Sequence, residues 1–163
     1  MVVSLYYKKL HKEAIPPTRA NPGDSGWDIR SIEKVVLQPN SVSKVHTGLS
    51  VEIPTGYELQ VRGKSGVALN LGLSIAQGVG TIDSGYRGEV CVLVRNSNPF
   101  TRSIDAGEMI AQLVLSEVPD SKFEEAVELT DTIRGDKGFG STPVTATVQL
   151  KVQKPKAVRM EKE

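Results

Sequence analysis

The sequence predicts a single all-β domain with at most one short helix. Short runs rich in β-branched and aromatic residues recur along nearly the whole chain, and Gly, Pro, Asn and Asp separate them. Few windows keep a helical period for more than two turns. Many short strands at regular spacing are typical of a sandwich, a jelly roll or a barrel. With 163 residues, of which 39% are hydrophobic, the chain suits one domain with a real core.

The expected elements follow one another in order along the chain. The strand runs are VVSLYY (2–7), KVVL (34–37), VSKVHTGLSVEI (42–53), YELQVR (57–62), EVCVLVRN (89–96), MIAQLVLSEV (109–118) and VTATVQLKV (144–152). The segment SGVALNLG (65–72) is the best candidate for a short helix. Turn residues at PPT, NPGDSG, QPN, PTG, NSNPF and DAG separate the strands. No internal repeat or linker divides the chain, so we expect one domain.

Composition argues against several classes of protein. Twenty Lys and Arg residues against 19 Asp and Glu leave a net charge of +1, whereas broad binding to nucleic acid or anionic membranes needs a basic excess. The N-terminus lacks the apolar segment of a signal peptide, and no run approaches transmembrane length. We therefore expect a soluble, cytoplasmic protein that forms no stable complex with nucleic acid or membrane.

The few potential metal-binding side chains argue against a metal cluster. Cys91 is the only cysteine, so an internal disulfide is impossible, and its place in the apolar run VCVLV favours a buried, inert thiol. His11 and His46 are far apart in the sequence. We expect neither a cysteine zinc site nor a histidine cluster.

The stretch RGDKGFGST (134–142) places Gly135 and Gly140 at the spacing of a P-loop. However, Ser141 stands where that motif needs lysine, and the following residues begin with Pro143 and then alternate with a two-residue period. A P-loop must precede the N-terminus of a long helix, so this interpretation fails. The alternation over 144–152 indicates either an extra edge strand or, alternatively, a disordered tail.

Four further glycine-marked blocks interrupt the strands: DSGWDI (24–29), VRGKSGVALNLG (61–72), QGVGTIDSGYRGE (77–89) and AGEMIAQLVL (106–115). With RGDKGFGST, these five blocks resemble, in order and spacing, the trimeric dUTPase family (deoxyuridine 5'-triphosphate nucleotidohydrolases). The resemblance extends from about Leu5 to Thr142. It implies a distorted, barrel-like jelly roll, a homotrimer whose sites are shared between subunits, and Mg²⁺-dependent hydrolysis of dUTP to dUMP and pyrophosphate. Such a dUTP diphosphatase limits uracil incorporation into DNA and supplies dUMP for thymidylate synthesis.

The third block would carry the catalytic residue. In isolation, Asp83 in TIDSGYRGE suits a tight hairpin turn in which the aspartate bonds its own backbone. The resemblance implies instead that Asp83 is the general base that deprotonates the attacking water. It also implies that Tyr86 lies under the deoxyribose and leaves no room for a 2′-hydroxyl, although a core tyrosine is the alternative.

Uracil selectivity would come from the same block. In the family, backbone groups of an open strand pair imitate the edge of a complementary base, and cytosine would leave buried polar groups unpaired. By resemblance, these groups belong to Gln77, Gly80, Thr81 and Ile82 and to the return strand near Cys91. Gln77 stands where many relatives have asparagine.

The second, first and fourth blocks would hold the phosphates and the metal. The resemblance implies that Lys64, Ser65 and Gly66 bind the phosphate chain, with lysine where most relatives carry arginine. Strand alternation would put Arg62 on the same face as Lys64, where it would either assist in binding phosphate or remain solvated, and a solvated side chain is expected. Asp28 would reach Mg²⁺ through water, since Mg²⁺ keeps several waters and takes oxygens from substrate phosphates. Gln112 would bond near the α-phosphate, or alternatively to a neighbouring strand.

The fifth block would be a C-terminal lid over the nucleotide. By resemblance, Arg134 engages the γ-phosphate, Phe139 stacks on uracil, and Gly140 and Ser141 offer donors to the phosphates. The expected organisation is a core over 1–133, a lid motif over 134–142 and a tail over 143–163. Two alternatives stay open: a dCTP deaminase-type relative of the same fold, and a regulator that uses this fold to bind a partner.

Overall fold

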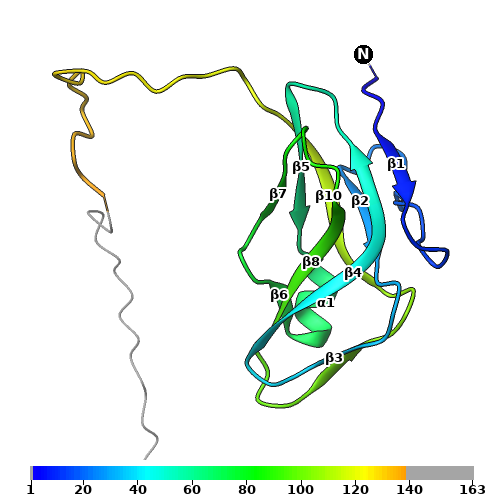
Figure 1. The fold of residues 1–163 in the computed structure, drawn as a ribbon. Coiled ribbons are helices and arrows are strands. Elements are labelled where there is room, and N and C mark those ends of the chain that lie inside the picture. Colours follow the sequence, from blue (N-terminus) through cyan, green and yellow to red (C-terminus); the bar gives the residue numbers. More distant parts are fainter. Residues whose placement is uncertain (1, 139–163) are drawn as a thin grey trace, which may run out of the picture. The chain divides into compact units, whose positions relative to one another are not determined.

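The computed structural model of the protein describes residues 2–138 and divides the chain into two units, Met1–Lys122 and Phe123–Glu163 (Figure 1). The first unit holds every helix and strand of the described residues, and residues 123–138 form only bends, turns and irregular chain. The tail over 143–163, with the strand expected over 144–152, lies outside the described residues. Nowhere in the described part does a helix have the length and apolar character needed to span a membrane.

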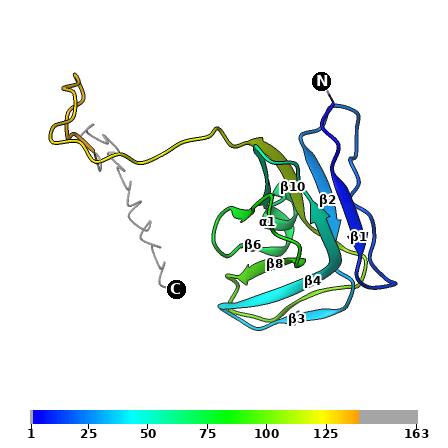
Figure 2. The same ribbon diagram turned by 45° about the horizontal axis from the view of Figure 1, so that its top comes forward.

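Two four-stranded antiparallel sheets form the first unit. One has the order β1 (Tyr6–Lys9), β4 (Ser41–Glu52), β8 (Glu89–Asn96) and β6 (Leu73–Ile75). The other has the order β2 (Gly26–Arg30), β10 (Met109–Glu117), β5 (Tyr57–Arg62) and β7 (Gly80–Ile82). β3 (Val35–Leu37) pairs with β9 (Arg102–Ile104), and α1 (Ser65–Leu71) is the one helix in the described part of the chain (Figure 2). The predicted all-β class with a single short helix is confirmed.

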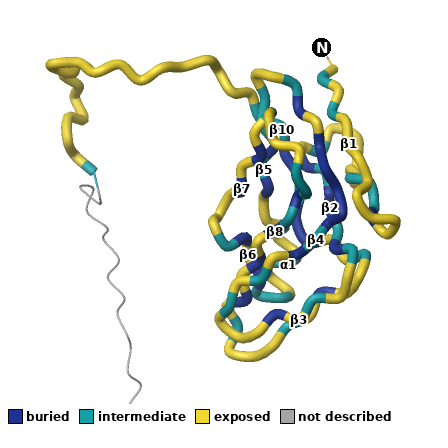
Figure 3. The backbone as a smooth tube through the Cα atoms, in the orientation of Figure 1, coloured by how far each residue is buried: buried dark blue, intermediate teal, exposed yellow. Residues whose placement is uncertain are grey.

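Residues from both sheets form one apolar core (Figure 3). Along β8, buried Val90, Val92 and Val94 alternate with more exposed neighbours, which is the two-residue period of a strand with one inward face. Leu59 of β5 and Leu113 of β10 belong to the same cluster from the other sheet. Each fully buried Val or Leu side chain contributes about 1.5–3 kcal/mol, so the packing of the two sheets is the main stabilising interaction.

A buried asparagine ties the β3–β9 pair to the end of β8. Asn96 is fully buried, and its Nδ2 donates to the carbonyl oxygens of Leu37, Gln38 and Phe100 at 3.0–3.1 Å. Its Oδ1 accepts the backbone N–H of Asn98 at 3.0 Å. Because every polar atom of this amide has a partner, the desolvation of Asn96 is offset and three segments are held in register.

The agreement with the expected elements depends on element length. YELQVR and EVCVLVRN form strands with the expected bounds, and the helix ends at Leu71 because Gly72, with φ 64°, caps it in the left-handed conformation. The N-terminal strand covers Tyr6–Lys9 and not 2–7. Four strands were not expected: β2, β6, β7 and β9. Each has only three to five residues, so a two-residue period is hard to recognise, whereas β3, which is equally short, was expected because all three of its residues are apolar.

Candidate active site

Asp28, Lys64 and Gln112 form a group that we call the β2–β10 cluster. Asp28 lies on β2 directly opposite Gln112 of β10, and Lys64 immediately precedes α1. The Lys64 ammonium forms an ion pair with Asp28, whose side chain is only 11% exposed. Gln112 Nε2 donates to the carbonyl oxygen of Gly63 at 3.0 Å. The first, second and fourth sequence blocks therefore meet within one chain.

Gly26 makes room for Gln112, which explains the glycine of DSGWDI. A Cβ atom on Gly26 would overlap Gln112 Oε1 and would lie 3.0 Å from Gln112 Cβ. Any side chain at this position must displace the Gln112 amide. The sequence singles out the block DSGWDI but does not predict that Gly26 makes room for Gln112. The two residues become neighbours only through the pairing of β2 with β10.

Ser65 and Gly66 begin α1 beside the β2–β10 cluster, and both are exposed. The N-cap residue, Lys64, makes no side-chain bond to this helix, and the first N–H groups of a helix have no intrahelical acceptor. A hollow of about 330 Å³ is lined by Gly63, Lys64, Ser65 and, from the third block, Gly78. Arg62 is exposed and donates to Gln60 Oε1, which agrees with a solvated side chain.

Residues 83–89, which we call the Asp83 turn, connect β7 to β8. The Asp83 carbonyl oxygen accepts the N–H of Tyr86 at 3.0 Å, and the Asp83 side chain is exposed with no partner among residues 2–138. Tyr86 donates its hydroxyl to the carbonyl oxygen of Glu89 at 3.0 Å, and a Cβ on Gly88 would overlap the tyrosine ring. Tyr86 is 46% exposed, so it is not a core residue.

The Asp83 turn is not the hairpin that its composition predicts. β7 pairs with β5, through Leu59 opposite Ile82 and Val61 opposite Gly80, whereas β8 lies in the other sheet. The chain therefore crosses between sheets at this turn, and the flanking strands do not pair with each other. Gly80 and Ile82 are buried, whereas Gln77 and Thr81 are exposed.

Cys91 lies on the outward face of β8, opposite His46 of β4. The expectation of a buried thiol was wrong, because Cys91 alternates with core residues Val90 and Val92 and is only partly buried. Burial, and then the negative charge of Glu89, raise the pKa of Cys91 to about 11. The thiol is therefore protonated at neutral pH, which agrees with the expected low reactivity.

The second unit contains the start of the fifth block. Arg134 Nε donates to the carbonyl oxygen of Lys137 at 3.1 Å, and Gly135 donates its N–H to the Thr132 carbonyl oxygen at 3.1 Å. Gly135 has φ 55°, a conformation that favours glycine. Phe139, Gly140 and Ser141 lie outside the described residues.

The strand register separates the β2–β10 cluster from the Asp83 turn of the same chain. Leu59 is opposite Ile82, so Asp83 lies beside the start of β5, whereas Lys64 follows the end of β5. At about 3.3 Å per residue, the six residues from Glu58 to Lys64 correspond to roughly 20 Å. Asp83 and Lys64 of one chain therefore lie toward opposite ends of β5.

The family model described as dUTPase matches residues 12–143 of this sequence. The chain belongs to the dUTPase family. It is 45% identical over 146 residues to the deoxyuridine 5'-triphosphate nucleotidohydrolase of Zymomonas mobilis, covering 88% of this chain and all of that one. It is 40% identical over 142 residues to the enzyme of that name from Clostridium novyi, covering 87% of this chain and all of that one.

Solved dUTPase structures share the fold. A variant of the Staphylococcus bacteriophage 80alpha dUTPase with dUpNHpp matches with a TM-score of 0.81 and 30% identity, over 86% of this chain and 99% of that one. A variant from phage phi11 of S. aureus, described with a structural Mg(II) ion, matches with a TM-score of 0.72 and 27% identity, over 77% and 97%. The jelly-roll-like architecture expected for this dUTPase is thereby confirmed.

Proposed function

We propose that this dUTPase hydrolyses dUTP to dUMP and pyrophosphate with Asp83 as the general base. Membership of the dUTPase family over residues 12–143 carries the proposal. The carboxylate of Asp83 is exposed and has no partner among residues 2–138, which supports its role, since a carboxylate with a free lone pair can accept a proton from water. Water thus activated attacks the α-phosphorus, and pyrophosphate leaves.

The β2–β10 cluster is the site we assign to the phosphate chain. Lys64 supplies a positive charge, Ser65 a hydroxyl, and the first turn of α1 uncapped N–H groups, including that of Gly66. Gln112 is fixed by its bond to the Gly63 carbonyl oxygen and bonds near the α-phosphate. Lys64 also pairs with Asp28, and an ammonium group has three N–H donors, so it can contact a phosphate oxygen while Asp28 holds it in position.

The donor chemistry of Asp28 fits a magnesium ion. Mg²⁺ prefers oxygen ligands, and Asp28 is a nearly buried carboxylate beside the cation that would contact the phosphates. Asp28 would hold the ion through water, while the substrate phosphates supply the remaining oxygens. When bound, the ion stabilises negative charge on the pyrophosphate leaving group.

We assign a homotrimer from the dUTPase family, and the separation of the two regions supports sites that are shared between subunits. Asp83 and Lys64 of one chain are roughly 20 Å apart by the strand register, whereas a general base must be within hydrogen-bond reach of the water it activates. The Asp83 turn of one subunit therefore completes the phosphate site of another. The lid motif over 134–142, with Arg134 on the γ-phosphate and Phe139 on uracil, is part of the same proposal.

Nucleoside selectivity is assigned to β7 and Tyr86. The hydroxyl of Tyr86 is bonded to the Glu89 carbonyl oxygen, which fixes the ring as a flat surface against deoxyribose and excludes a 2′-hydroxyl. Backbone groups from Gln77 to Ile82, with those near Cys91, would bind the uracil edge. Because dUTP and dUMP belong to DNA synthesis inside the cell, we place the enzyme in the cytoplasm.

Product analysis with each deoxynucleoside triphosphate tests the proposal. Full-length protein with Mg²⁺ should convert dUTP to dUMP and pyrophosphate and leave dATP, dGTP and dTTP intact. Release of ammonia from dCTP would identify a deaminase-type relative. Binding of dUTP without turnover would instead favour a regulator that retains the nucleotide site.

A further inference from the structure

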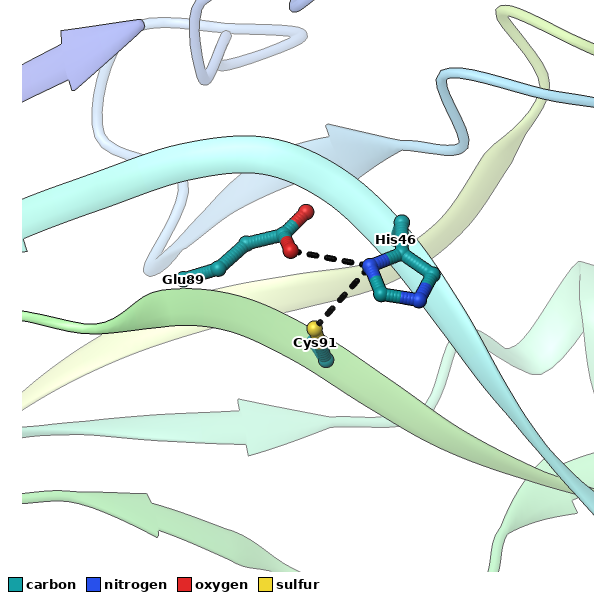
Figure 4. A group of neighbouring side chains, drawn as sticks. All are labelled: His46, Glu89 and Cys91. Atoms are coloured by element: carbon teal, nitrogen blue, oxygen red, sulfur yellow. Dashed lines mark hydrogen bonds and ion pairs between the residues drawn. The ribbon is translucent and has the colours of Figure 1, made fainter. Parts of the chain in front are cut away.

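Three side chains of different ligand chemistry converge on the outward face of the β4–β8 pair. His46, Glu89 and Cys91 form this group, which we call the β4–β8 trio (Figure 4). One ligand atom from each, a ring nitrogen, a carboxylate oxygen and the sulfur, lies within 4.8 Å of the other two. None of its members belongs to the β2–β10 cluster, and Glu89 is the residue at which the Asp83 turn ends and β8 begins.

The strand register brings the trio together. His46 is the cross-strand partner of Cys91, and Glu89 precedes Cys91 by two residues, so it projects from the same face of β8. All three are partly buried, whereas Val45, Val90 and Val92 point into the core. Two paired strands are a rigid support, so the ligand atoms are positioned before any ion arrives.

A β-bulge orients the carboxylate of the trio. The β4–β8 register shifts between His46 and Ser50, and Gly48 within this bulge has φ 65°. The Gly48 N–H donates to Glu89 Oε1 at 2.8 Å, which leaves Oε2 facing His46 Nδ1 at 2.8 Å. Fixing one oxygen so that the other faces the ligand centre is the role of an outer-shell hydrogen bond in metal sites.

We propose that the β4–β8 trio binds a zinc-like divalent cation through His46 Nδ1, a carboxylate oxygen of Glu89 and the Cys91 thiolate. The Sγ–Nδ1 distance is 3.6 Å, which matches the edge of a tetrahedron with bonds of about 2.3 Å to sulfur and about 2.0 Å to nitrogen. The oxygen must recede slightly from the nitrogen to reach the same geometry. Because the trio is partly open to solvent, water takes the fourth position.

The ligand set selects against the metal proposed for catalysis. Thiolate and imidazole favour Zn²⁺, whereas Mg²⁺ requires oxygen ligands in octahedral geometry. Binding converts the Cys91 thiol to a thiolate, and the proton that a neutral His46 ring directs from Nδ1 to Glu89 moves to Nε2, so one proton passes to solvent for each ion bound. The neighbouring Glu89 charge, which disfavours the thiolate alone, becomes favourable once a dication is present.

Cobalt substitution tests the site independently of dUTP hydrolysis. Chelator-stripped, reduced, full-length protein is titrated with Co²⁺ while absorption is recorded. A thiolate-to-cobalt charge-transfer band should appear with one ion per chain, and it can come only from Cys91, the single cysteine. Zn²⁺ should abolish the band by displacement, and excess Mg²⁺ should leave it unchanged.

Variants distinguish Zn²⁺ binding at the β4–β8 trio from Zn²⁺ binding elsewhere on the protein. Cys91→Ser and His46→Gln should weaken Zn²⁺ binding by more than about 100-fold, since even an outer-shell loss costs 10–100-fold. His11→Gln removes the only other histidine and should bind as the parent does. Zn²⁺ should raise the Tm of the parent and of His11→Gln but not of Cys91→Ser. A cooperative melting transition without Zn²⁺ shows that each variant is folded. A parent without the band, or Cys91→Ser with unchanged Zn²⁺ affinity, would overturn the assignment.

Discussion

The β2–β10 cluster and the Asp83 turn differ in how their functional side chains are held. The cluster is interlocked through side chains, because Lys64 pairs with Asp28 and Gln112 bonds the Gly63 carbonyl oxygen. Within the turn, Tyr86 N–H and the Tyr86 hydroxyl donate to backbone oxygens, and the carboxylate of Asp83 is left exposed. A phosphate site must hold charges at fixed positions before substrate binds, whereas a general base must keep a lone pair free.

The turn nevertheless has firm support from the neighbouring strand. Ser50 donates its hydroxyl to the Arg87 carbonyl oxygen at 2.8 Å, and Arg87 closes the turn through the Ser84 carbonyl oxygen at 2.6 Å. Thr47 donates to the Val90 carbonyl oxygen at 2.5 Å. β4 therefore fixes the backbone of the turn without using the carboxylate of Asp83.

The largest effect should come from removing the base of the turn. Asp83→Asn keeps the size of the side chain and loses its basicity, so kcat should fall by about 10²–10⁴-fold. Because Asp83 is exposed, Tm should stay at the parent value. Steady-state kinetics measure the loss of kcat. Equilibrium binding of dUTP measures the affinity, which should be largely kept.

Asp120→Asn is the matched control, since Asp120 lines the same hollow as Asp83. It should turn over dUTP as the parent does. Near-normal turnover in Asp83→Asn would remove the proposed base, and equal losses in both variants would indicate a general charge effect.

Adding a single methyl group at Gly26 should disrupt the β2–β10 cluster. Gly26→Ala places a Cβ on the Gln112 amide, so we expect about 1–3 kcal/mol of destabilisation by overpacking. Displacement of Gln112 by about 1 Å should lower kcat/KM by about 100-fold. Gly63→Ala serves as the stability control, because its Cβ would meet only Ile75 at 3.8 Å.

A second substitution separates packing from chemistry at this position. Adding Gln112→Ala to Gly26→Ala removes the overlapping amide, so urea unfolding should show stability largely restored while activity stays low. If stability is not restored, the overlap with Gln112 is not the cause.

The sequence could predict the residues of the β2–β10 cluster and of the Asp83 turn, but not how strand pairing places them in space. Long strands such as YELQVR are visible because their period lasts several residues, whereas three-residue β7 is not. The pairing of β7 with β5, and not with β8, depends on contacts between sheets that no local pattern encodes. For the same reason, the ligand atoms of His46 and Cys91 meet although the residues are distant in sequence, and the role of Gly26 becomes visible only beside Gln112.

The free energy of unfolding should depend on pH through Glu89, which lies at the end of the Asp83 turn and not in the β2–β10 cluster. Burial pushes the pKa of Glu89 up, but the hydrogen bonds from His46 and the Gly48 N–H outweigh it, so the pKa lies below the ordinary value. A lowered pKa stabilises the fold above the unfolded value and loses that contribution as pH falls through the folded value. Stability should therefore decline below about pH 4.5, the ordinary value for Glu.

Urea unfolding of Glu89→Gln over this acidic range measures the contribution. The variant should be less stable than the parent at neutral pH, and the difference should shrink as the pH falls. Glu52→Gln, at the exposed end of β4, should show the parent's pH dependence. A constant difference between Glu89→Gln and the parent across the range would contradict the assignment.

The smallest effect should come from exchanging the cation of the cluster. Lys64→Arg keeps the charge and the ion pair with Asp28, and guanidinium can bind phosphate with two parallel bonds, so KM should stay the same or decrease. Lys64→Met leaves the nearly buried Asp28 carboxylate unpaired and should lower both stability and dUTP affinity. Arg62→Lys changes an exposed cation that bonds Gln60 in the described part of the chain, and this substitution should be neutral. Isothermal titration with a non-hydrolysable dUTP analogue compares the three variants. A large loss in Lys64→Arg, equal to that of Lys64→Met, would show that the ammonium itself and not its charge is required.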